Sequence, residues 1–329
     1  MSTLQIFCDA RFGEREFQLL REGIAPHRLL LPREAGASVL AVSAHDPAIC
    51  EAGIAFGQPA VESVRLAEGL RWLQVSTAGF SRYDTPEFRA LAAARGLVVT
   101  NSSSVYAEAC AEHVFAFMLA EARQLPAALA SRCPNGSEEW LRLRDASFCL
   151  QDQEVVILGF GTIAARLIEL LAPLRMRITA VRRQARGDEG VAVVAPENLR
   201  EALATADHVI NILPDNAASL RFISRERLAQ MKPGAIFYNI GRGTTVDQEA
   251  LAASLRSGHL GAAWLDVTDP EPLPPEHPLW KCPNLLITPH VAGSTPQFSP
   301  RAIRIAADQV RRVLAGEALV NVVQKGQSI

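Results

Sequence analysis

The sequence predicts an α/β protein built on doubly wound parallel sheets, and three observations carry this prediction. Short apolar segments rich in β-branched residues alternate with helical patterns along most of the 329 residues. A glycine-rich turn separates one of these strands from a helix at mid-chain, between Gly159 and Ala164. The composition, with 49% hydrophobic and 21% charged residues, is typical of a globular protein, and the length is enough for two domains of ordinary size.

The first 100 residues predict a small α/β unit. Strands are expected over residues 4–8, 38–42, 72–75 and 97–100, and a helix over residues 86–95. The third strand runs into a turn of small residues, Ser76, Thr77, Ala78 and Gly79. Consecutive backbone N–H groups in such a turn form an anion-binding nest, and a plain strand-to-helix turn is the alternative.

A long helix is expected over residues 104–123, where apolar residues recur at helical spacing. The following segment, residues 125–150, has mixed polar and basic character and predicts a loop or arm, with Trp140 as its one large anchor. An exposed Trp in an arm packs either against a partner subunit or against its own domain, and the residues leave both interpretations open.

The glycine-rich turn has the features of a dinucleotide site. It follows an apolar strand, residues 155–158, whose composition suits burial on both faces. Gly159 permits the tight turn, Gly161 allows a ligand to approach the backbone, and Ala164 lets the next helix pack closely. The N-terminus of that helix offers free N–H groups to a pyrophosphate. A tight turn without a ligand is the alternative.

The end of the following strand, residues 177–183, bears on the choice of cofactor. NAD-binding units place an Asp or Glu about 20 residues after the glycines to hold the ribose 2′-hydroxyl. Here Arg182 stands 23 residues after Gly159 and is followed by Arg183, so we expect no carboxylate at this strand end. Arginines at this position pair with the 2′-phosphate of NADP, and a solvated basic loop is the alternative.

The rest of the chain continues the alternation of strands and helices. Strands are expected over residues 206–213, 235–240, 261–267 and 285–288, and helices over residues 224–231, 248–257 and 301–314. Three polar side chains follow strand ends: Arg242, Glu271 and His290. Reduction of a 2-keto acid needs a cation for the carboxylate, a proton donor for the alkoxide, and a carboxylate that orients the donor and favours its charged form.

Composition excludes several other classes of function. The net charge of −2 implies no nucleic-acid or acidic-membrane partner. The six cysteines form no CxxC pair and no Cys/His cluster, so we expect reduced thiols and no metal site. The sequence shows neither a signal-peptide pattern nor a run near 18 apolar residues, which predicts a cytoplasmic protein without a membrane span.

Five motifs occur in a fixed order along the second part of the chain. They are Gly159-x-Gly161-x-x-Ala164, Met231-Lys232-Pro233-Gly234-Ala235, Asn239-x-x-Arg242-Gly243, Leu265-Asp266-Val267 with Glu271-Pro272, and Thr288-Pro289-His290 with Gly293-Ser294-Thr295. With these motifs in this order, the chain from about Trp72 to the C-terminus resembles the D-isomer-specific 2-hydroxyacid dehydrogenases, which include glyoxylate/hydroxypyruvate reductases and phosphoglycerate dehydrogenase. The first 70 residues resemble the family only in outline.

The resemblance implies a role for each of these side chains. Arg242 would bind the substrate carboxylate and carbonyl oxygen, His290 would be the general acid in reduction, and Glu271 would hydrogen-bond His290. The backbone amides of residues 76–79 would help to hold the substrate carboxylate, and Asp266 would lie near the nicotinamide carboxamide. The further cofactor-binding positions that the resemblance implies are Gly159, Phe160, Gly161, Thr162, Ile163, Arg182, Arg183, Leu213, Pro214, Ile240, Gly241 and His290.

The resemblance also implies an architecture. Two Rossmann-like doubly wound parallel-sheet domains are expected, with the nucleotide-binding domain inserted in the substrate domain. The substrate domain would comprise residues 1–102 and 292–329, and the NAD(P)-binding domain residues 103–291. A homodimer would form through the long helix near residues 104–123 and the arm that follows it.

Departures from the family pattern refine the expected reaction. Family enzymes that use NAD carry an acidic residue where this chain has Arg182, which favours NADP(H) and leaves NAD(H) as a possible cofactor. Phe80 follows the small-residue turn and would narrow the pocket toward small substrates. The leading hypothesis is NADPH-dependent reduction of a small 2-keto acid of the glyoxylate or hydroxypyruvate type. The alternative is a nucleotide-sensing, corepressor-like binding protein on the same fold. A formate dehydrogenase is disfavoured, because the site of such an enzyme resembles this one with Gln at the position of Glu271.

Overall fold

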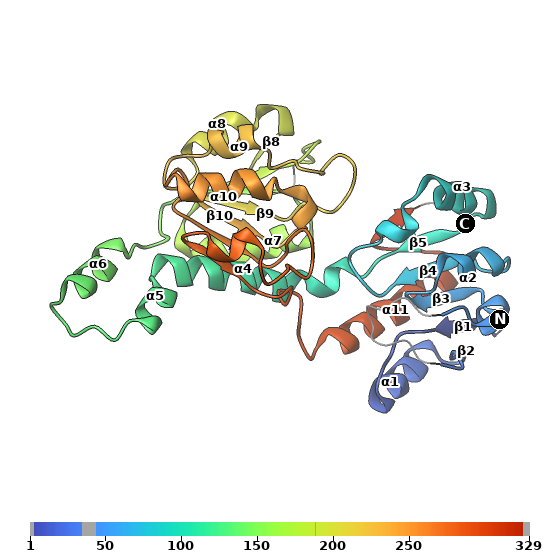
Figure 1. Cartoon of the computed structure of the whole chain (residues 1–329). Coiled ribbons are helices and arrows are strands. Elements are labelled where there is room, and N and C mark those ends of the chain that lie inside the picture. Colours follow the sequence, from blue (N-terminus) through green and yellow to red (C-terminus); the bar gives the residue numbers. More distant parts are fainter. Residues whose placement is uncertain (1–2, 35–43, 188, 325–329) are drawn as a thin grey trace. The chain divides into compact units, whose positions relative to one another are not determined.

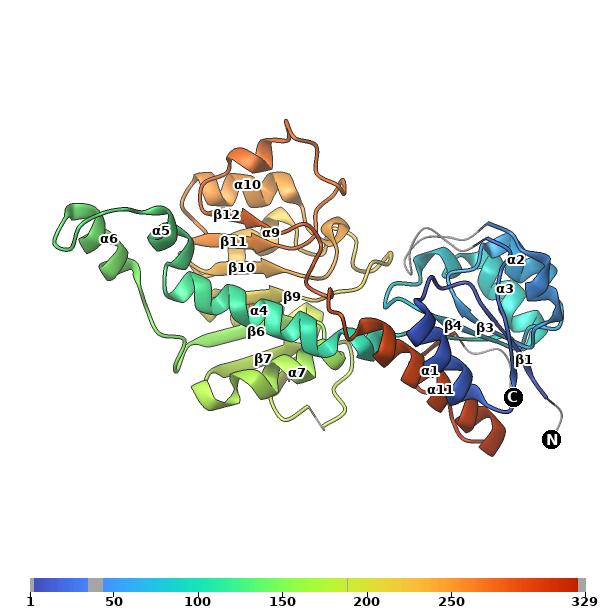
Figure 2. The ribbon, with the colours of Figure 1, turned by 90° about the horizontal axis from the view of Figure 1, so that it is seen from below.

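The computed structural model describes residues 3–34, 44–187 and 189–324 (Figures 1 and 2). The chain divides into two units, one of which is inserted in the other. The first unit comprises Met1–Tyr106 and Thr295–Ile329, and the second comprises Ala107–Ser294. Each unit is a largely or wholly parallel sheet covered by helices, so the predicted α/β class and the inserted arrangement are confirmed.

The sheet of the first unit has six strands in the order β13-β5-β4-β3-β1-β2. They are β1 (Gln5–Cys8), β2 (Arg28–Leu30), β3 (Ile54–Gly57), β4 (Trp72–Val75), β5 (Val98–Thr100) and β13 (Val322–Gln324). Strands β1 to β5 are parallel, whereas β13 pairs antiparallel with β5 at the edge. Strands β2, β3 and β13 are not predicted from the sequence, because segments this short show little periodicity. The strand expected over residues 38–42 lies outside the described residues.

Helices cover both faces of this first sheet. On one face α1 (Glu14–Ile24) packs against α11 (Phe298–Ala315), which comes from the last part of the chain (Figure 2). The other face carries α2 (Val61–Leu66), α3 (Pro86–Arg95) and the short 3-10 helices η1 (Pro47–Glu51) and η2 (Ser81–Tyr83), and η3 (Ser103–Tyr106) ends the first segment of the unit. Alternate residues of each central strand therefore enter two separate cores, as the period of a strand requires.

The sheet of the second unit has seven parallel strands in the order β12-β11-β10-β9-β6-β7-β8. They are β6 (Glu154–Leu158), β7 (Arg177–Val181), β8 (Ala192–Val194), β9 (His208–Asn211), β10 (Ile236–Asn239), β11 (Ala262–Leu265) and β12 (Leu285–Ile287). The strand order reverses beside β6, whose neighbours are β7 and β9. In open α/β sheets, ligands bind at the carboxyl ends of the strands beside such a reversal.

Helices also cover both faces of the second sheet. On one face α4 (Ala107–Ala122) packs against α7 (Thr162–Leu171) (Figure 2). The other face carries α8 (Leu199–Thr205), α9 (Arg225–Gln230) and α10 (Gln248–Arg256), whose apolar residues form one core with the strands. Strand β8 and helix α8 are not predicted from the sequence. Short 3-10 helices lie at Ala172–Leu174, Pro196–Asn198, Gly243–Thr245 and Pro278–Lys281.

The segment after α4 forms an arm that projects from the second unit (Figures 1 and 2). It contains two short helices, α5 (Leu125–Ala130) and α6 (Glu138–Ala146), neither of which has a fully buried residue. Three leucines of the arm are exposed: Leu125 at 44%, Leu129 at 83% and Leu141 at 43% of their surface. The arm was expected from the sequence as a polar connection, and the structure shows that it carries apolar surface as well.

Candidate active site

The glycine-rich turn leaves β6 and enters α7 at the carboxyl edge of the seven-stranded sheet. Gly159 has a φ of 101°, a backbone conformation that favours glycine. Gly161 is the residue before the first turn of α7; no side chain caps the helix there, and a Cβ atom at Gly161 would meet nothing within 4 Å. Open space in front of uncapped N–H groups fits the diphosphate of a dinucleotide. Phe160, Thr162 and Ile163 belong to the same turn and the start of the helix.

The end of β7 differs from the sequence-based expectation that no carboxylate lies there. Glu189, seven residues after Arg182, folds back so that its Oε1 atom accepts a hydrogen bond from Arg182 Nη1 at 3.0 Å. Arg182 is therefore ion-paired, with 19% of its side chain exposed, whereas Arg183 is exposed. A count of about 20 residues from the glycines does not find this carboxylate, because Glu189 lies in the loop beyond the end of β7.

A buried polar network shapes the turns after β9 and β10. Asn211 Nδ2 donates to Asn239 Oδ1 at 2.9 Å and to Thr245 Oγ1 at 2.7 Å. Asn239 Oδ1 also accepts a hydrogen bond from the N–H of Gly241 at 3.0 Å. A Cβ atom on Gly241 would lie 2.6 Å from the carbonyl oxygen of Leu213, so the two turns touch through their backbones. The candidate cofactor-contacting residues Leu213, Pro214, Ile240 and Gly241 lie in these turns.

Arg242 follows this network directly. Its guanidinium Nη1 donates to the carbonyl oxygen of Gly241 at 2.6 Å, and its own carbonyl oxygen accepts from Thr245 Oγ1 at 2.6 Å. A Cβ atom at Gly243 would lie 2.0 Å from the carbonyl carbon of Thr268, so only glycine fits there. The Arg242 turn therefore lies against the turn after β11 that leads to Glu271.

Glu271 and His290 form a hydrogen-bonded pair after the adjacent strands β11 and β12. Glu271 Oε1 contacts His290 Nδ1, and Glu271 Oε2 accepts a hydrogen bond from the N–H of Thr268 at 3.4 Å. The side chains of His290 and Glu271 are 45% and 39% exposed. With Nδ1 engaged by the carboxylate, Nε2 is the imidazole nitrogen that remains for a reacting group.

The backbone at His290 is strained, and Asp266 holds it. His290 has a φ of 52°, a conformation that costs a residue with a side chain roughly 1 to 3 kcal/mol. Asp266, only 2% exposed, accepts hydrogen bonds from Thr288 Oγ1 at 2.6 Å and from the N–H groups of Val291 and Ala292, each at 2.9 Å. The residues on both sides of His290 are therefore fixed to the end of β11. The family resemblance implies only that Asp266 lies near the nicotinamide; its hydrogen bonds to the residues around His290 are an additional finding.

His113 on α4 is a further residue of this region. Its Nε2 atom lies 3.4 Å from Thr288 Oγ1 and 3.7 Å from Asp266 Oδ1. Burial lowers the pKa of His113 below its ordinary value, and the charge of Asp266 opposes this change. Helical periodicity identifies His113 as part of α4 but gives no indication that it reaches the loop beside His290.

In the first unit, the small-residue turn after β4 carries the backbone amides that the sequence indicates for anion binding. The carbonyl oxygens of Thr77 and Ala78 accept hydrogen bonds from the N–H of Ser102 at 3.0 Å and from Asn101 Nδ2 at 2.7 Å. Among the described residues, no acceptor satisfies the N–H groups of Thr77, Ala78 and Gly79. The buried Ser76 begins this turn. Three adjacent free donors favour an anion such as a carboxylate.

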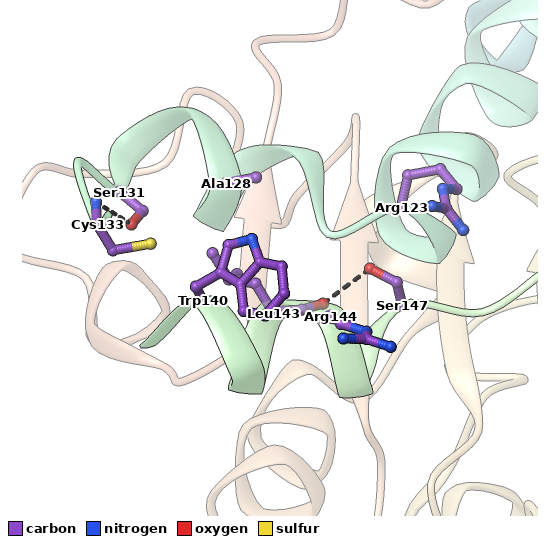
Figure 3. A pocket seen from close by; sticks show the side chains of 8 residues that line it. All are labelled: Arg123, Ala128, Ser131, Cys133, Trp140, Leu143, Arg144 and Ser147. Atoms are coloured by element: carbon purple, nitrogen blue, oxygen red, sulfur yellow. Dashed lines mark hydrogen bonds between the residues drawn. The ribbon is translucent and has the colours of Figure 1, made fainter. Parts of the chain in front are cut away.

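The arm of the second unit contains a cavity of about 350 Å³ (Figure 3). Its lining residues are Arg123, Ala128, Ser131, Cys133, Trp140, Leu143, Arg144 and Ser147. The Arg144 guanidinium carbon lies 5.4 Å from the centre of the Trp140 ring. The lining contains no carboxylate or imidazole, and its titratable side chains are Arg123, Arg144 and Cys133.

Three findings concern the described part of the chain as a whole. Within residues 3–34, 44–187 and 189–324, no three His, Cys, Asp or Glu side chains are grouped so that they could hold a metal ion. Across the same ranges, no helix is long and apolar enough to cross a membrane. All six cysteines are free thiols.

Comparison with known proteins identifies the class of protein, a nicotinamide-dependent oxidoreductase, and the family within that class. Residues 115–292, more than half of the chain, match the NAD binding domain of the D-isomer specific 2-hydroxyacid dehydrogenases. The chain belongs to this family, whose members are NAD(P)-dependent oxidoreductases of 2-hydroxy acids.

Named relatives share this assignment. The chain is 33% identical over 230 residues to the mouse glyoxylate reductase/hydroxypyruvate reductase, an alignment covering 68% of this chain and 69% of that protein. It is 33% identical over 242 residues to the D-3-phosphoglycerate dehydrogenase of Mycobacterium tuberculosis H37Rv, covering 72% of this chain but only 44% of that longer protein. A solved D-isomer specific 2-hydroxyacid dehydrogenase from Xanthobacter autotrophicus Py2, in complex with NADPH and MES, has a TM-score of 0.79, 27% identity and 98% coverage of both chains.

Proposed function

We propose that this protein reduces a small 2-keto acid, of the glyoxylate or hydroxypyruvate type, to the D-2-hydroxy acid and prefers NADPH. The observation that carries the proposal is the His290–Glu271 pair, which lies beside the Arg242 turn at the carboxyl edge of the second sheet. A His with one nitrogen held by a carboxylate is equipped to donate a proton from the other nitrogen. The name of the mouse relative supports the substrate class.

The proposed reaction adds one hydride and one proton to the keto group. NADPH, when bound, supplies the hydride for the keto carbon. His290 donates the proton from Nε2 to the keto oxygen, and Glu271 stabilises the protonated imidazole through Nδ1. Arg242 binds the substrate carboxylate and the keto oxygen; guanidinium suits this task because its donors are arranged in a planar fork. Loss of the charge at any of these positions, or of the planar fork at Arg242, therefore reduces the stabilisation of the transition state.

We propose that the second unit is the NAD(P)-binding domain and the first unit the substrate domain. The turn from Gly159 to Ile163 would receive the diphosphate, supported by the open space at Gly161 and the uncapped start of α7. The turns that contain Leu213, Pro214, Ile240 and Gly241, together with Asp266, would line the nicotinamide side. In the first unit, the amides of residues 77–79 would bind the substrate carboxylate, which their free donors support.

We also propose a cytoplasmic homodimer. Six free thiols suit a reducing compartment. The exposed leucines of the arm, Leu125, Leu129 and Leu141, give a second copy apolar surface to cover. Light scattering during gel filtration measures the mass in solution: twice the 35.6 kDa of one chain supports the dimer, and 35.6 kDa contradicts it.

The test is a spectrophotometric assay of purified protein with NADPH or NADH against glyoxylate, hydroxypyruvate and pyruvate. We expect fast oxidation of NADPH and slow oxidation of NADH. His290→Asn should lower kcat by about 10²- to 10⁴-fold, the usual contribution of a general acid, with an unchanged circular dichroism spectrum. Near-normal turnover by this variant would remove His290 from the reaction. Absence of turnover in a protein shown to bind NADPH would contradict the proposed substrate class.

A further inference from the structure

The loop between β7 and β8 is organised around one buried carboxylate. The side chain of Glu189 is 2% exposed and accepts three hydrogen bonds. Oε1 accepts from Arg182 Nη1 at 3.0 Å and from the N–H of Arg186 at 2.7 Å, and Oε2 accepts from the N–H of Gly187 at 2.8 Å. Charge-assisted bonds to both oxygens fix the path of the backbone that follows the strand.

This arrangement divides the arginines of the loop into two kinds. The Arg182 guanidinium is held by Glu189, and its central carbon lies 5.7 Å from the ring centre of Phe160 in the glycine-rich turn. The loop is thereby connected to the turn that we propose for the diphosphate. Arg183 and Arg186 are exposed on the same loop. Exposed guanidinium groups whose backbone is already fixed lose less entropy when they bind a phosphate.

An acidic residue beside this strand has a second interpretation, because NAD-binding units use one to accept the ribose 2′-hydroxyl. The structure disfavours this role for Glu189. Both of its oxygens are already engaged by three donors, and its side chain is almost completely covered. A sugar hydroxyl would have to displace a backbone amide or the Arg182 guanidinium, at the expense of a charge-assisted hydrogen bond.

We propose that Glu189 is a positioning residue for recognition of the 2′-phosphate of NADPH. It holds Arg182 and the amides of residues 186 and 187 so that Arg183 and Arg186 meet the phosphate together. The inference rests on the NADPH preference proposed above. It assigns to Glu189, a negatively charged residue, a role in supporting the binding of a negatively charged phosphate. Its charge is compensated within the loop by Arg182, so the two exposed arginines remain available.

The experiment measures dissociation constants of NADPH and NADH by fluorescence titration, without substrate, in the full-length protein and in Glu189→Gln. We expect the dissociation constant of NADPH to rise about tenfold, equivalent to the loss of one charge-assisted contact, and that of NADH to change less than about twofold. The KM for NADPH should rise in parallel while kcat at saturating NADPH stays the same. Adenosine 2′,5′-bisphosphate should compete less well in the variant.

A matched control is available at the opposite end of β7. Glu154→Gln, at the start of β6, removes the pair between Glu154 Oε1 and Arg177 Nη2, which are 3.0 Å apart, and should leave both dissociation constants unchanged. Arg182→Gln should reproduce the effect of Glu189→Gln, and the double variant should add little, because the two side chains act as a unit.

Three outcomes would overturn the inference. Equal weakening of NADPH and NADH would indicate a general structural role, weakening of NADH alone would indicate ribose recognition, and no change would exclude any role in cofactor binding. The titration also separates this inference from the proposed reaction. Tight NADPH binding without turnover rejects the reaction alone, whereas wild-type protein that binds NADPH no better than NADH rejects the cofactor preference and this inference together.

Discussion

Two loops at the carboxyl edge of the second sheet are each held by a buried carboxylate, and they differ in what the carboxylate connects. Asp266 accepts hydrogen bonds from residues 22 to 26 positions later in the chain, so it joins the end of β11 to the loop that follows β12. Glu189 accepts from residues two to seven positions earlier and therefore organises only its own loop.

The donors differ as well. Asp266 has two backbone amides and a hydroxyl, which are neutral, whereas Glu189 has two backbone amides and the Arg182 guanidinium. The long-range arrangement supports a strained residue, His290, that we place in the chemistry. The local one supports exposed arginines that we place in cofactor choice. We therefore expect loss of Asp266 to affect catalysis and stability together, and loss of Glu189 to affect binding of one cofactor.

The largest effect is expected for Asp266→Ala. Three donors, one buried and two partly buried, lose a charged acceptor, which should lower the free energy of unfolding by about 3 to 5 kcal/mol. His290 should lose its fixed position, which should reduce kcat by about 10²-fold. Urea unfolding and steady-state assays measure the two effects.

Asp266→Asn keeps one acceptor oxygen and should show smaller losses of unfolding free energy and of kcat. This variant allows the measurement if Asp266→Ala does not fold. Asp207→Asn is the matched control, because Asp207 Oδ2 accepts from the N–H of Glu154 at 2.9 Å at the opposite edge of the same sheet. Normal kcat in a folded Asp266→Ala protein would show that the two loops do not differ as described.

A smaller effect is expected from the protonation of His113, which lies beside Asp266 and Thr288. Its pKa is lowered by burial, so the unfolded chain takes up a proton first as the pH falls through 6.5. The stability that neutral His113 contributes is fully present above pH 6.5 and decreases below it. The difference in unfolding free energy between wild type and His113→Gln should therefore shrink between pH 7.5 and pH 5.

Buried His208, whose pKa burial lowers to about 4, changes stability in the same direction, but it is present in both proteins and cancels in this difference. A difference that is independent of pH would show that His113 does not exchange a proton on unfolding.

The smallest effect is expected from the pH dependence of Glu189 itself. Hydrogen bonds from the N–H groups of Arg186 and Gly187 and from Arg182 hold its pKa below the ordinary 4.5. Its contribution to stability is present above pH 4.5 and is lost as the pH falls through the lower value in the folded protein. The urea midpoints of wild type and Glu189→Gln should differ by a constant amount from pH 8 to pH 5 and converge below pH 4.5. Convergence already at pH 6 would contradict this assignment.

The sequence predicts the parts of the molecule that depend on local pattern. Apolar strands bounded by turns indicated β6, β10 and β11, and the rule that ligands bind at carboxyl strand ends selected Arg242, Glu271 and His290 for attention. The family assignment and the two-unit α/β fold are confirmed. Strands β2 and β13, three residues each, are stabilised by pairing with neighbours distant in sequence, which no local pattern reveals.

The supporting residues were beyond prediction for a related reason. Glu189 lies in a loop seven residues after Arg182, and its contact with Arg182 is made by the fold of that loop, so counting from Gly159 could not place it beside Arg182. His113 reaches Thr288 only because α4 packs on the sheet. Asp266 was expected near the cofactor, but its bonds to the loop around His290 require the register of β11 with β12.

The return of α11 to the first unit has a consequence for synthesis on the ribosome. The apolar side of α1, including Leu20 and Ile24, is covered by α11, which begins only at Phe298. At roughly 5 to 20 residues per second, the nascent chain carries that uncovered surface for on the order of half a minute while the inserted unit emerges. The inserted unit is continuous in sequence and is free to fold first, and the unit that contains the N-terminal segment is the one that finishes last.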